Sequence, residues 1–418
     1  MLDRRKFVKE WLANAASLGM LAVTGLLLNS MIAKLYGPAA LGIFNQVYAI
    51  FVFASQIATF GVQFSVLRHI AGVDEGHPEA SRILSAALLL VAACAAATAL
   101  LLFVVFRLFG AAIYSPGVAE GVMLMLPGLW FFAINKVLLN ALNGIQANTL
   151  YAAFVGLRYL LILVFLIAAI AAGMRGEQLA AILSASEGTL FLGLAAACVR
   201  RFPGMARNAG RDWIAPHRAF GLRSMPGGFA VELNSRVDVL ILGLFTSDAV
   251  VGVYSFAAFF VEGLLQLTVI SRRLVDPILT RLADDAGALV ALLRRGRNLG
   301  ALAAGVLTAV AVAAYPWYAT LAGTDSLATE SWPVFAVLAF GAGIFAVYAT
   351  FGGIFVQTGR PMLQTRLNLA ILLINVALNF VLVPAFGLIG AAVATSLSFI
   401  AGALYFRALV RRHFSVTF

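Results

Sequence analysis

The sequence predicts an all-α membrane protein with about twelve transmembrane helices. Of its 418 residues, 62% are hydrophobic and 11% are charged, and the mean hydropathy is +0.97. A soluble domain carries about 25% charged residues, so a chain this apolar belongs in a lipid environment. Apolar runs of about 20 residues, each long enough to cross a hydrocarbon core of roughly 30 Å, alternate with short polar connections.

The twelve spans are placed from these apolar runs and from the Gly, Pro and charged residues that interrupt them. They form two sets of six, which predict two six-helix bundles over residues 1–205 and 206–418. The predicted spans are residues 11–34, 42–68, 81–106, 118–143, 149–173, 177–199, 219–245, 249–272, 297–319, 331–357, 363–383 and 388–410.

The distribution of Lys and Arg predicts that both termini are cytoplasmic. With the amino terminus placed inside, 23 of the 29 Lys and Arg residues fall on the cytoplasmic side and only Lys34, Arg107 and Arg175 on the other. Short cytoplasmic loops carry this excess of positive charge in membrane proteins. The net charge of +11 is therefore read as membrane topology, and we expect no nucleic-acid partner.

The sequence offers no pattern typical of an enzyme. Its four histidines are widely separated near predicted loops, and its two cysteines lie in apolar spans. They form no catalytic or metal-ligand spacing. We therefore expect no catalytic residue, no metal and no cofactor.

An internal repeat relates the two halves. The segment after the first span, Leu35–Phe44, resembles the segment after the seventh, Leu244–Tyr254, with an offset of 210 residues. Polar residues then coincide on one helical stripe, and six spans in each half predict a pseudo-symmetry axis along the membrane normal, as in many transporters. The aligned pairs are Gly42 with Gly252, Asn45 with Ser255, Gln56 with Gln266 and Gln63 with Arg273.

Three segments carry a resemblance to a known family. They are Leu35-Tyr-Gly-Pro followed by Gly42-Ile-Phe, then Asp238–Gly243 followed by Gly252-Val-Tyr254, and Asn375–Pro384 followed by Gly387–Ala392. Together they resemble the O-antigen and exopolysaccharide flippases, Wzx-type, of the multidrug/oligosaccharidyl-lipid/polysaccharide exporter superfamily. Drug-exporting and lipid II-flipping relatives share the pattern in weaker form.

The resemblance implies a multi-pass protein of the bacterial inner membrane. Its expected cargo is a polyprenyl-diphosphate-linked oligosaccharide of lipopolysaccharide or exopolysaccharide synthesis, moved by alternating access of two bundles. The expected partners are this lipid-linked substrate and membrane lipids, and a partnership with polysaccharide polymerase machinery stays open. A cation-coupled multidrug exporter and a lipid II-type flippase of the same superfamily are the alternatives.

The seventh predicted span is unusually polar. It contains Glu232 and Arg236 at a spacing of four residues, the order that favours a helical ion pair, and Asp238 follows. Charges within a membrane turn toward a bundle interior or water, so we expect this span to line a transport cavity and to bend at Pro226–Gly228. The alternative is an ion pair that holds helices together.

Two further cations lie in the fourth and fifth spans. Lys136 shares a helical face with Asn140, and Arg158 lies in the inner half of its span, beside a connection without Lys or Arg. Arg suits phosphate through its forked donor geometry. We expect both cations to bind the diphosphate, against the alternative that they extend to the interface and bind lipid phosphates nonspecifically.

The polar and charged residues within the predicted spans give two sets of candidate site residues. Amide side chains suit sugar hydroxyls because they both donate and accept hydrogen bonds, and intramembrane acids can couple transport to protons or sodium. The expected substrate-binding residues are Lys136, Arg158, Arg236, Asn140, Gln56 and Gln266, and the coupling candidates are Glu232, Asp238, Glu262 and Glu187.

Two other classes of protein fit less well. A membrane polymerase or ligase needs large outer loops with acid and base residues, and the outer connections here are short. A structural scaffold has no use for polar stripes on several helices. The intramembrane cations also weigh against a cation-binding drug exporter.

Overall fold

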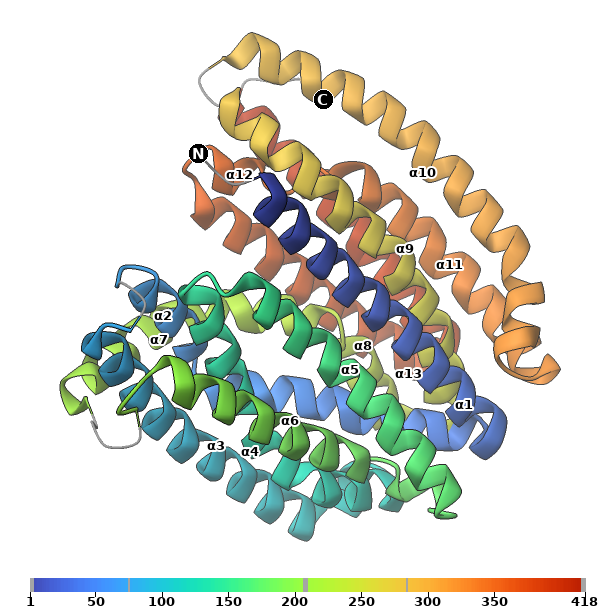
Figure 1. Cartoon of the computed structure of the whole chain (residues 1–418). Coiled ribbons are helices and arrows are strands. Elements are labelled where there is room, and N and C mark those ends of the chain that lie inside the picture. Colours follow the sequence, from blue (N-terminus) through green and yellow to red (C-terminus); the bar gives the residue numbers. More distant parts are fainter. Residues whose placement is uncertain (1–3, 74–75, 206–209, 283–284, 415–418) are drawn as a thin grey trace. The chain divides into compact units, whose positions relative to one another are not determined.

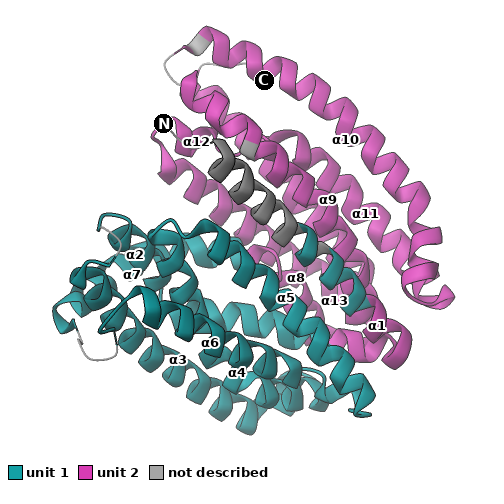
Figure 2. Cartoon of the chain, viewed as in Figure 1, with its two compact units in different colours: residues 1–29, 43–232 teal, residues 30–42, 233–418 magenta. Residues whose placement is uncertain are grey.

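The computed structural model of the chain describes residues 4–73, 76–205, 210–282 and 285–414 (Figure 1). Over these residues the regular structure is helical throughout, with no strand. This confirms the predicted all-α class. The chain separates into two compact units, residues 1–29 with 43–232 and residues 30–42 with 233–418 (Figure 2). The first of these is unit 1 and the second is unit 2.

Unit 1 is built from the kinked helix α1 and the helices that follow it. Its carboxyl-terminal helix is α7, so the chain passes from one unit to the other between Glu232 and Leu233. Helix α4 packs against α2, α3 and α6, and α5 packs against α6. The helices are α1 (Arg4–Thr59), α2 (Val62–Ile70), α3 (Pro78–Ile113), α4 (Pro116–Gly144), α5 (Asn148–Ala171), α6 (Ala181–Arg201) and α7 (Ile214–Asn234), with 3₁₀ turns η1 (Gly176–Gln178) and η2 (Arg211–Trp213).

Unit 2 contains the remaining helices together with residues 30–42 of α1. Helix α11 packs against α9, α10 and α13, and α8 packs against α13. A cluster of buried apolar side chains that includes Leu293, Phe355 and Phe406 joins α10, α12 and α13. The helices are α8 (Val237–Phe245), α9 (Asp248–Arg281), α10 (Ala286–Ala322), α11 (Asp325–Ala349), α12 (Ile354–Gln357) and α13 (Pro361–Phe414).

Nine helices among the described residues are long and apolar enough to cross a membrane. Two of them, α1 and α13, each contain two predicted spans, because Gly37 (φ 82°) and Gly387 (φ 52°) interrupt the helix with a backbone conformation that suits glycine. The seventh predicted span is divided between α7 and α8. Each of the twelve predicted spans therefore lies on helical segments, and the protein is a multi-pass membrane protein.

The outward faces of several helices are apolar. Leu101 and Leu108 of α3 are 60% and 67% exposed, and Leu302 and Trp317 of α10 are 68% and 71% exposed. Exposed apolar surfaces of this kind mark contact with lipid or with another apolar surface. They are the surfaces that a bilayer would cover.

The seventh span is interrupted within its polar stretch. Helix α7 continues through Pro226, and the interruption lies at Ser235–Arg236, where Arg236 has φ −136° and ψ −6°. Just after it, the Val239 backbone N–H donates to the Asp238 side chain. A bend of α7 at Pro226–Gly228, where the proline removes one helical hydrogen bond, stays a prediction.

Candidate functional site

A buried ion pair joins the fifth and sixth helices of unit 1. Arg158 Nε lies 2.7 Å from Glu187 Oε1, and the Arg158 Nη2 group donates to Glu187 Oε2 at 3.3 Å. The side chains are 13% and 3% exposed. An unpaired charge at this depth would carry a large desolvation penalty, which each group reduces for the other by pairing with it.

Two residues of α4 complete this cluster. Asn135 is fully buried and donates through Nδ2 to the Glu187 backbone oxygen at 2.9 Å and to Glu187 Oε2 at 2.8 Å. Lys136 donates to the Ser55 hydroxyl at 2.8 Å and is attracted electrostatically by Glu232. Lys136 and Arg158 thus both have acidic neighbours.

An aromatic platform lies between the two cations. The Lys136 ammonium is 4.6 Å and the Arg158 guanidinium 4.7 Å from the centroid of the Phe132 ring, and Phe51 stacks on the same ring at 4.8 Å. Cation–π contacts contribute more when they are desolvated. These contacts hold both charged groups inside unit 1.

A cavity of about 50 Å³ opens beside the platform. This is room for a few water molecules or for a group of about their combined size. Arg158 and Glu187 supply its charged wall, and the rest is mostly aromatic and aliphatic. The other lining residues are Tyr48, Phe51, Phe132, Tyr159, Ile162 and Leu183.

Unit 2 has its own ion pair at the break of the seventh span. The Arg236 Nη1 and Nη2 groups lie 3.1 Å from Glu262 Oε1 and Oε2. This two-point geometry joins the start of α8 to α9. A forked contact of this kind is stronger and more specific in orientation than a single charged hydrogen bond.

Asp238 lies at the centre of a second buried cluster of unit 2. Its Oδ1 accepts from the Val239 backbone N–H at 2.8 Å. Its Oδ2 accepts from the Tyr254 hydroxyl of α9 and from the Thr395 hydroxyl of α13. Tyr254 and Thr395 are buried as well. Since Asp238 itself lies in α8, its carboxylate links α8, α9 and α13.

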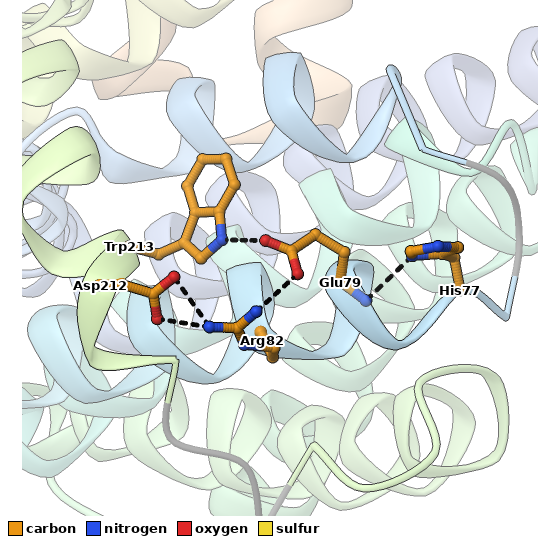
Figure 3. Close-up of polar contacts among 5 residues, drawn as sticks. All are labelled: His77, Glu79, Arg82, Asp212 and Trp213. Carbon is orange, nitrogen blue, oxygen red and sulfur yellow. Dashed lines mark hydrogen bonds and ion pairs between the residues drawn. The ribbon is translucent and has the colours of Figure 1, made fainter.

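A third polar network lies at the start of the third predicted span and in the residues before the seventh (Figure 3). Arg82 of α3 donates to Glu79 at 2.9 Å and to both carboxylate oxygens of Asp212 at 2.9 Å. Trp213 donates to Glu79 at 2.6 Å, and the Glu79 backbone N–H donates to His77 at 3.1 Å. The contacts attach the 3₁₀ turn η2, which precedes α7, to the amino-terminal end of α3.

His217 extends the attachment from the first turn of α7. Its Nε2 lies 3.0 Å from the Ile83 backbone oxygen and donates to it, and its Nδ1 lies 2.8 Å from the Ser65 hydroxyl. A neutral imidazole with its proton on Nε2 satisfies both contacts, because the Ser65 hydroxyl can then donate to Nδ1. Burial lowers the pKa of His217, and the nearby His69 lowers it further, although the hydrogen bond to Ile83 opposes the shift.

Comparison with known proteins decides the family. The sequence pattern described as "Polysaccharide biosynthesis protein" matches residues 7–271, more than half of the chain. The chain belongs to this polysaccharide biosynthesis family. No curated protein matches the sequence.

Solved structures similar to this family member share its fold. A lipid II flippase MurJ in an inward closed conformation superposes with a TM-score of 0.77 at 14% identity, covering 96% of this chain and 87% of that one. An inward-facing MATE family multidrug resistance transporter superposes with a TM-score of 0.72 at 15% identity, covering 97% of this chain and 94% of that one. A transporter from Pyrococcus furiosus, of the same superfamily as the MATE transporter, superposes with a TM-score of 0.63 at 14% identity, covering 98% of this chain and 95% of that one. These similarities show the fold of a superfamily of transporters.

Within this polysaccharide biosynthesis protein, the predicted site residues fall into two groups. Lys136, Arg158 and Glu187 meet in unit 1, where Glu232 also lies near Lys136. Arg236 and Glu262 pair in unit 2, where Asp238 has its own partners. The remaining predictions are scattered: Asn140 donates to the Lys136 backbone oxygen at 2.8 Å, Gln56 is buried in unit 1, and Gln266 is exposed in unit 2.

Several residues that complete these clusters were not predicted from the sequence. Asn135 and Ser55 hold Glu187 and Lys136, and Tyr254 and Thr395 hold Asp238. Asn135 could have been found, because a buried amide in a membrane span needs a hydrogen-bond partner. Phe132 lies four residues before Lys136, the spacing at which helical side chains meet.

Proposed function

We propose that this protein moves a polyprenyl-diphosphate-linked oligosaccharide across the bacterial inner membrane by alternating access, with both termini in the cytoplasm. The family and the fold support a transporter of polysaccharide synthesis. The observation that carries the substrate assignment is the pair of partly buried cations, Lys136 and Arg158, that contact the Phe132 ring. A diphosphate headgroup has the charge and the acceptor geometry that these two donors recognise.

The proposed binding mode separates headgroup from tail. The polyprenyl tail stays in the bilayer, since its transfer into water would lose about 0.8 kcal/mol for each CH₂ group. The diphosphate meets Lys136 and Arg158, and amide side chains such as Asn140 and Gln56 meet sugar hydroxyls. Arg236 and Gln266 are the proposed contacts from unit 2. The acids Glu187, Glu232, Asp238 and Glu262 are the proposed coupling groups.

Transport by reconstituted protein tests this proposal. Wild-type protein in liposomes is expected to move a fluorescent polyprenyl-diphosphate oligosaccharide between leaflets. The double variant Lys136→Ala, Arg158→Ala is expected to lose this transport while its level in the membrane is unchanged. Arg175→Ala, which removes an exposed Arg of unit 1 paired with Glu120, is the matched control. Undiminished transport by the double variant would remove the headgroup assignment.

A cation-coupled drug exporter is the second candidate. One observation favours it. Within the predicted spans, Arg158 has Glu187 as an acidic neighbour, Lys136 has Glu232 and Arg236 has Glu262. Because these acids offset the positive charges, the cations do not by themselves make the clusters repel a cationic drug. Export of a lipophilic cation driven by a proton or sodium gradient, with no movement of the diphosphate substrate, would favour this candidate.

A further inference from the structure

The buried cation of α5 is already occupied by a carboxylate of its own chain. Glu187 engages the Nε and Nη2 groups of Arg158. No described residue accepts a hydrogen bond from the third guanidinium nitrogen, Nη1. A guanidinium has five N–H donors, more than this one carboxylate uses. The cavity is lined by both Arg158 and Glu187. Arg158 therefore has N–H donors that Glu187 does not use, and it lies beside an open space.

Glu187, in contrast, has a second anchor. Asn135 donates both to the Glu187 backbone oxygen and to its carboxylate. This amide ties α4 to α6 whether or not Arg158 is engaged. If Arg158 turned away, the Glu187 carboxylate would keep one hydrogen-bond donor, which reduces the penalty for leaving it buried.

The charges in this part of unit 1 also balance without substrate. Lys136 and Arg158 supply two positive charges, and Glu187 and Glu232 supply two negative ones. A diphosphate diester brings two more negative charges. Because like charges at contact distance repel strongly in a poorly solvated site, the diester and the Glu187 carboxylate compete for the same guanidinium.

We infer that Glu187 is an internal competitor of the substrate: its carboxylate occupies on Arg158 the place that the diphosphate takes, and Asn135 holds it when it is displaced. This inference rests on the proposed function and adds a specificity-determining residue to it. The competition weakens substrate binding and speeds release, because the returning carboxylate displaces the headgroup. Asn135 is a positioning residue in this scheme.

The alternative is that the Arg158–Glu187 pair only joins α5 to α6. The two roles predict opposite effects of Glu187→Gln. A glutamine keeps an oxygen for Asn135 and removes the negative charge. If Glu187 competes with substrate, the variant binds an anionic headgroup more tightly and releases it more slowly. If the pair is only structural, binding is unchanged or weaker.

Direct binding to protein in lipid nanodiscs separates these outcomes. The probe is a synthetic farnesyl-diphosphate glucose diester, and a neutral farnesyl glucoside reports binding that does not depend on the diphosphate. Glu187→Gln is expected to bind the diester at least tenfold more tightly than wild type and the neutral glucoside equally. Transport of the polyprenyl-diphosphate substrate is expected to show a lower KM and a lower kcat. Glu120→Gln, which breaks the exposed pair with Arg175 in the same unit, is the matched control and is expected to change neither value.

The remaining outcomes are equally decisive. Equal or weaker diester binding by a folded Glu187→Gln protein, with wild type binding normally, overturns the competition and leaves the proposed function intact. Absence of diester binding in both proteins overturns the proposed function and this inference together. If Glu187→Gln fails to assemble, Glu187→Asp retains the charge but shortens the reach to Arg158. It is then expected to raise diester affinity severalfold, and an unchanged affinity counts against the inference.

Discussion

Gly42 of α1 and Gly252 of α9 pack with their backbones in contact within unit 2. A Cβ atom on Gly42 would overlap the Asp248 carbonyl oxygen, and one on Gly252 would overlap the Pro38 carbonyl oxygen. These are the two glycines that the internal repeat aligns. The close approach explains why residues 30–42 belong to unit 2 although they precede most of unit 1 in the sequence.

Alanine at either glycine is expected to destabilise the protein. The added methyl group must push two helices apart, and overpacking of this kind costs typically 1–3 kcal/mol. Thermal unfolding in detergent is the measurement, with Gly305→Ala as the control. Gly305 lies within α10, and a Cβ there meets open space, so this substitution is expected to be neutral or slightly stabilising. Equal melting of all three variants would contradict the close contact.

The stability of unit 1 is expected to fall in mild acid because of His217. Its pKa is lowered by burial in the folded protein, whereas in the unfolded chain it is about 6.5. Unfolding therefore takes up a proton below about pH 6.5, and stability declines as pH falls from there through the folded pKa. Gln at position 217 is expected to flatten this part of the pH profile.

The control for this pH profile is His413→Gln, since His413 is exposed at the end of α13. It is expected to leave the slope unchanged. Unfolding measured at intervals between pH 5 and 8 checks both variants. A slope that survives in His217→Gln would assign the acid sensitivity to another group.

The positions of the membrane-spanning helices in this chain were predictable, because the length of an apolar run is enough to indicate such a helix. Most residues of every predicted span are helical. The helices α1 and α13 are interrupted at Gly37, which precedes Pro38, and at Gly387, which lies three residues after Pro384. The interruption at Arg236 was not predicted. Arg236 there contacts Glu262 of a different helix, α9, a partner that no local pattern reveals.

Site residues were predictable as types and less so as partners. The structure gives Arg236 a two-point contact with Glu262 on the next helix, which was not predicted, and its pairing with Glu232, four residues away, stays a prediction. Arg158 and Glu187 were both singled out, but for different roles, and they form one ion pair. Spacing along one helix predicts neighbours on that helix, whereas partners across helices depend on packing that a single sequence does not determine.

Removal of one partner from the Arg236–Glu262 pair is expected to destabilise unit 2 more than removal of both. Arg236→Gln leaves the Glu262 carboxylate without its forked partner, at a cost of roughly 1–3 kcal/mol, between the values for exposed and buried pairs. Arg236→Gln with Glu262→Gln removes the charge imbalance. A double-mutant cycle on thermal unfolding measures the coupling, and purely additive effects would show that the contact contributes nothing.

The Tyr254 hydroxyl is expected to stabilise the Asp238 cluster. Tyr254→Phe removes a buried donor to the carboxylate and leaves the ring in place, so it is expected to cost about 1–3 kcal/mol. Tyr315→Phe, which removes a buried hydroxyl bonded to Ser331 at 2.9 Å in the same unit, is the control for loss of a neutral hydrogen bond and is expected to cost less. A larger loss of stability in Tyr315→Phe would indicate that Asp238 does not depend on Tyr254.

Phe132 is expected to matter for the cations more than for the fold. Its ring contacts both Lys136 and Arg158, and cation–π contacts contribute about 0.5–2 kcal/mol each. Phe132→Leu keeps an apolar side chain but removes the ring face, so transport of the diphosphate-linked substrate is expected to fall at least severalfold. Phe132→Tyr keeps the ring face and is expected to retain most of the transport. If Phe132→Leu transports as well as Phe132→Tyr at equal protein levels, the ring only fills space and the cations are positioned by Ser55 and Glu187 alone.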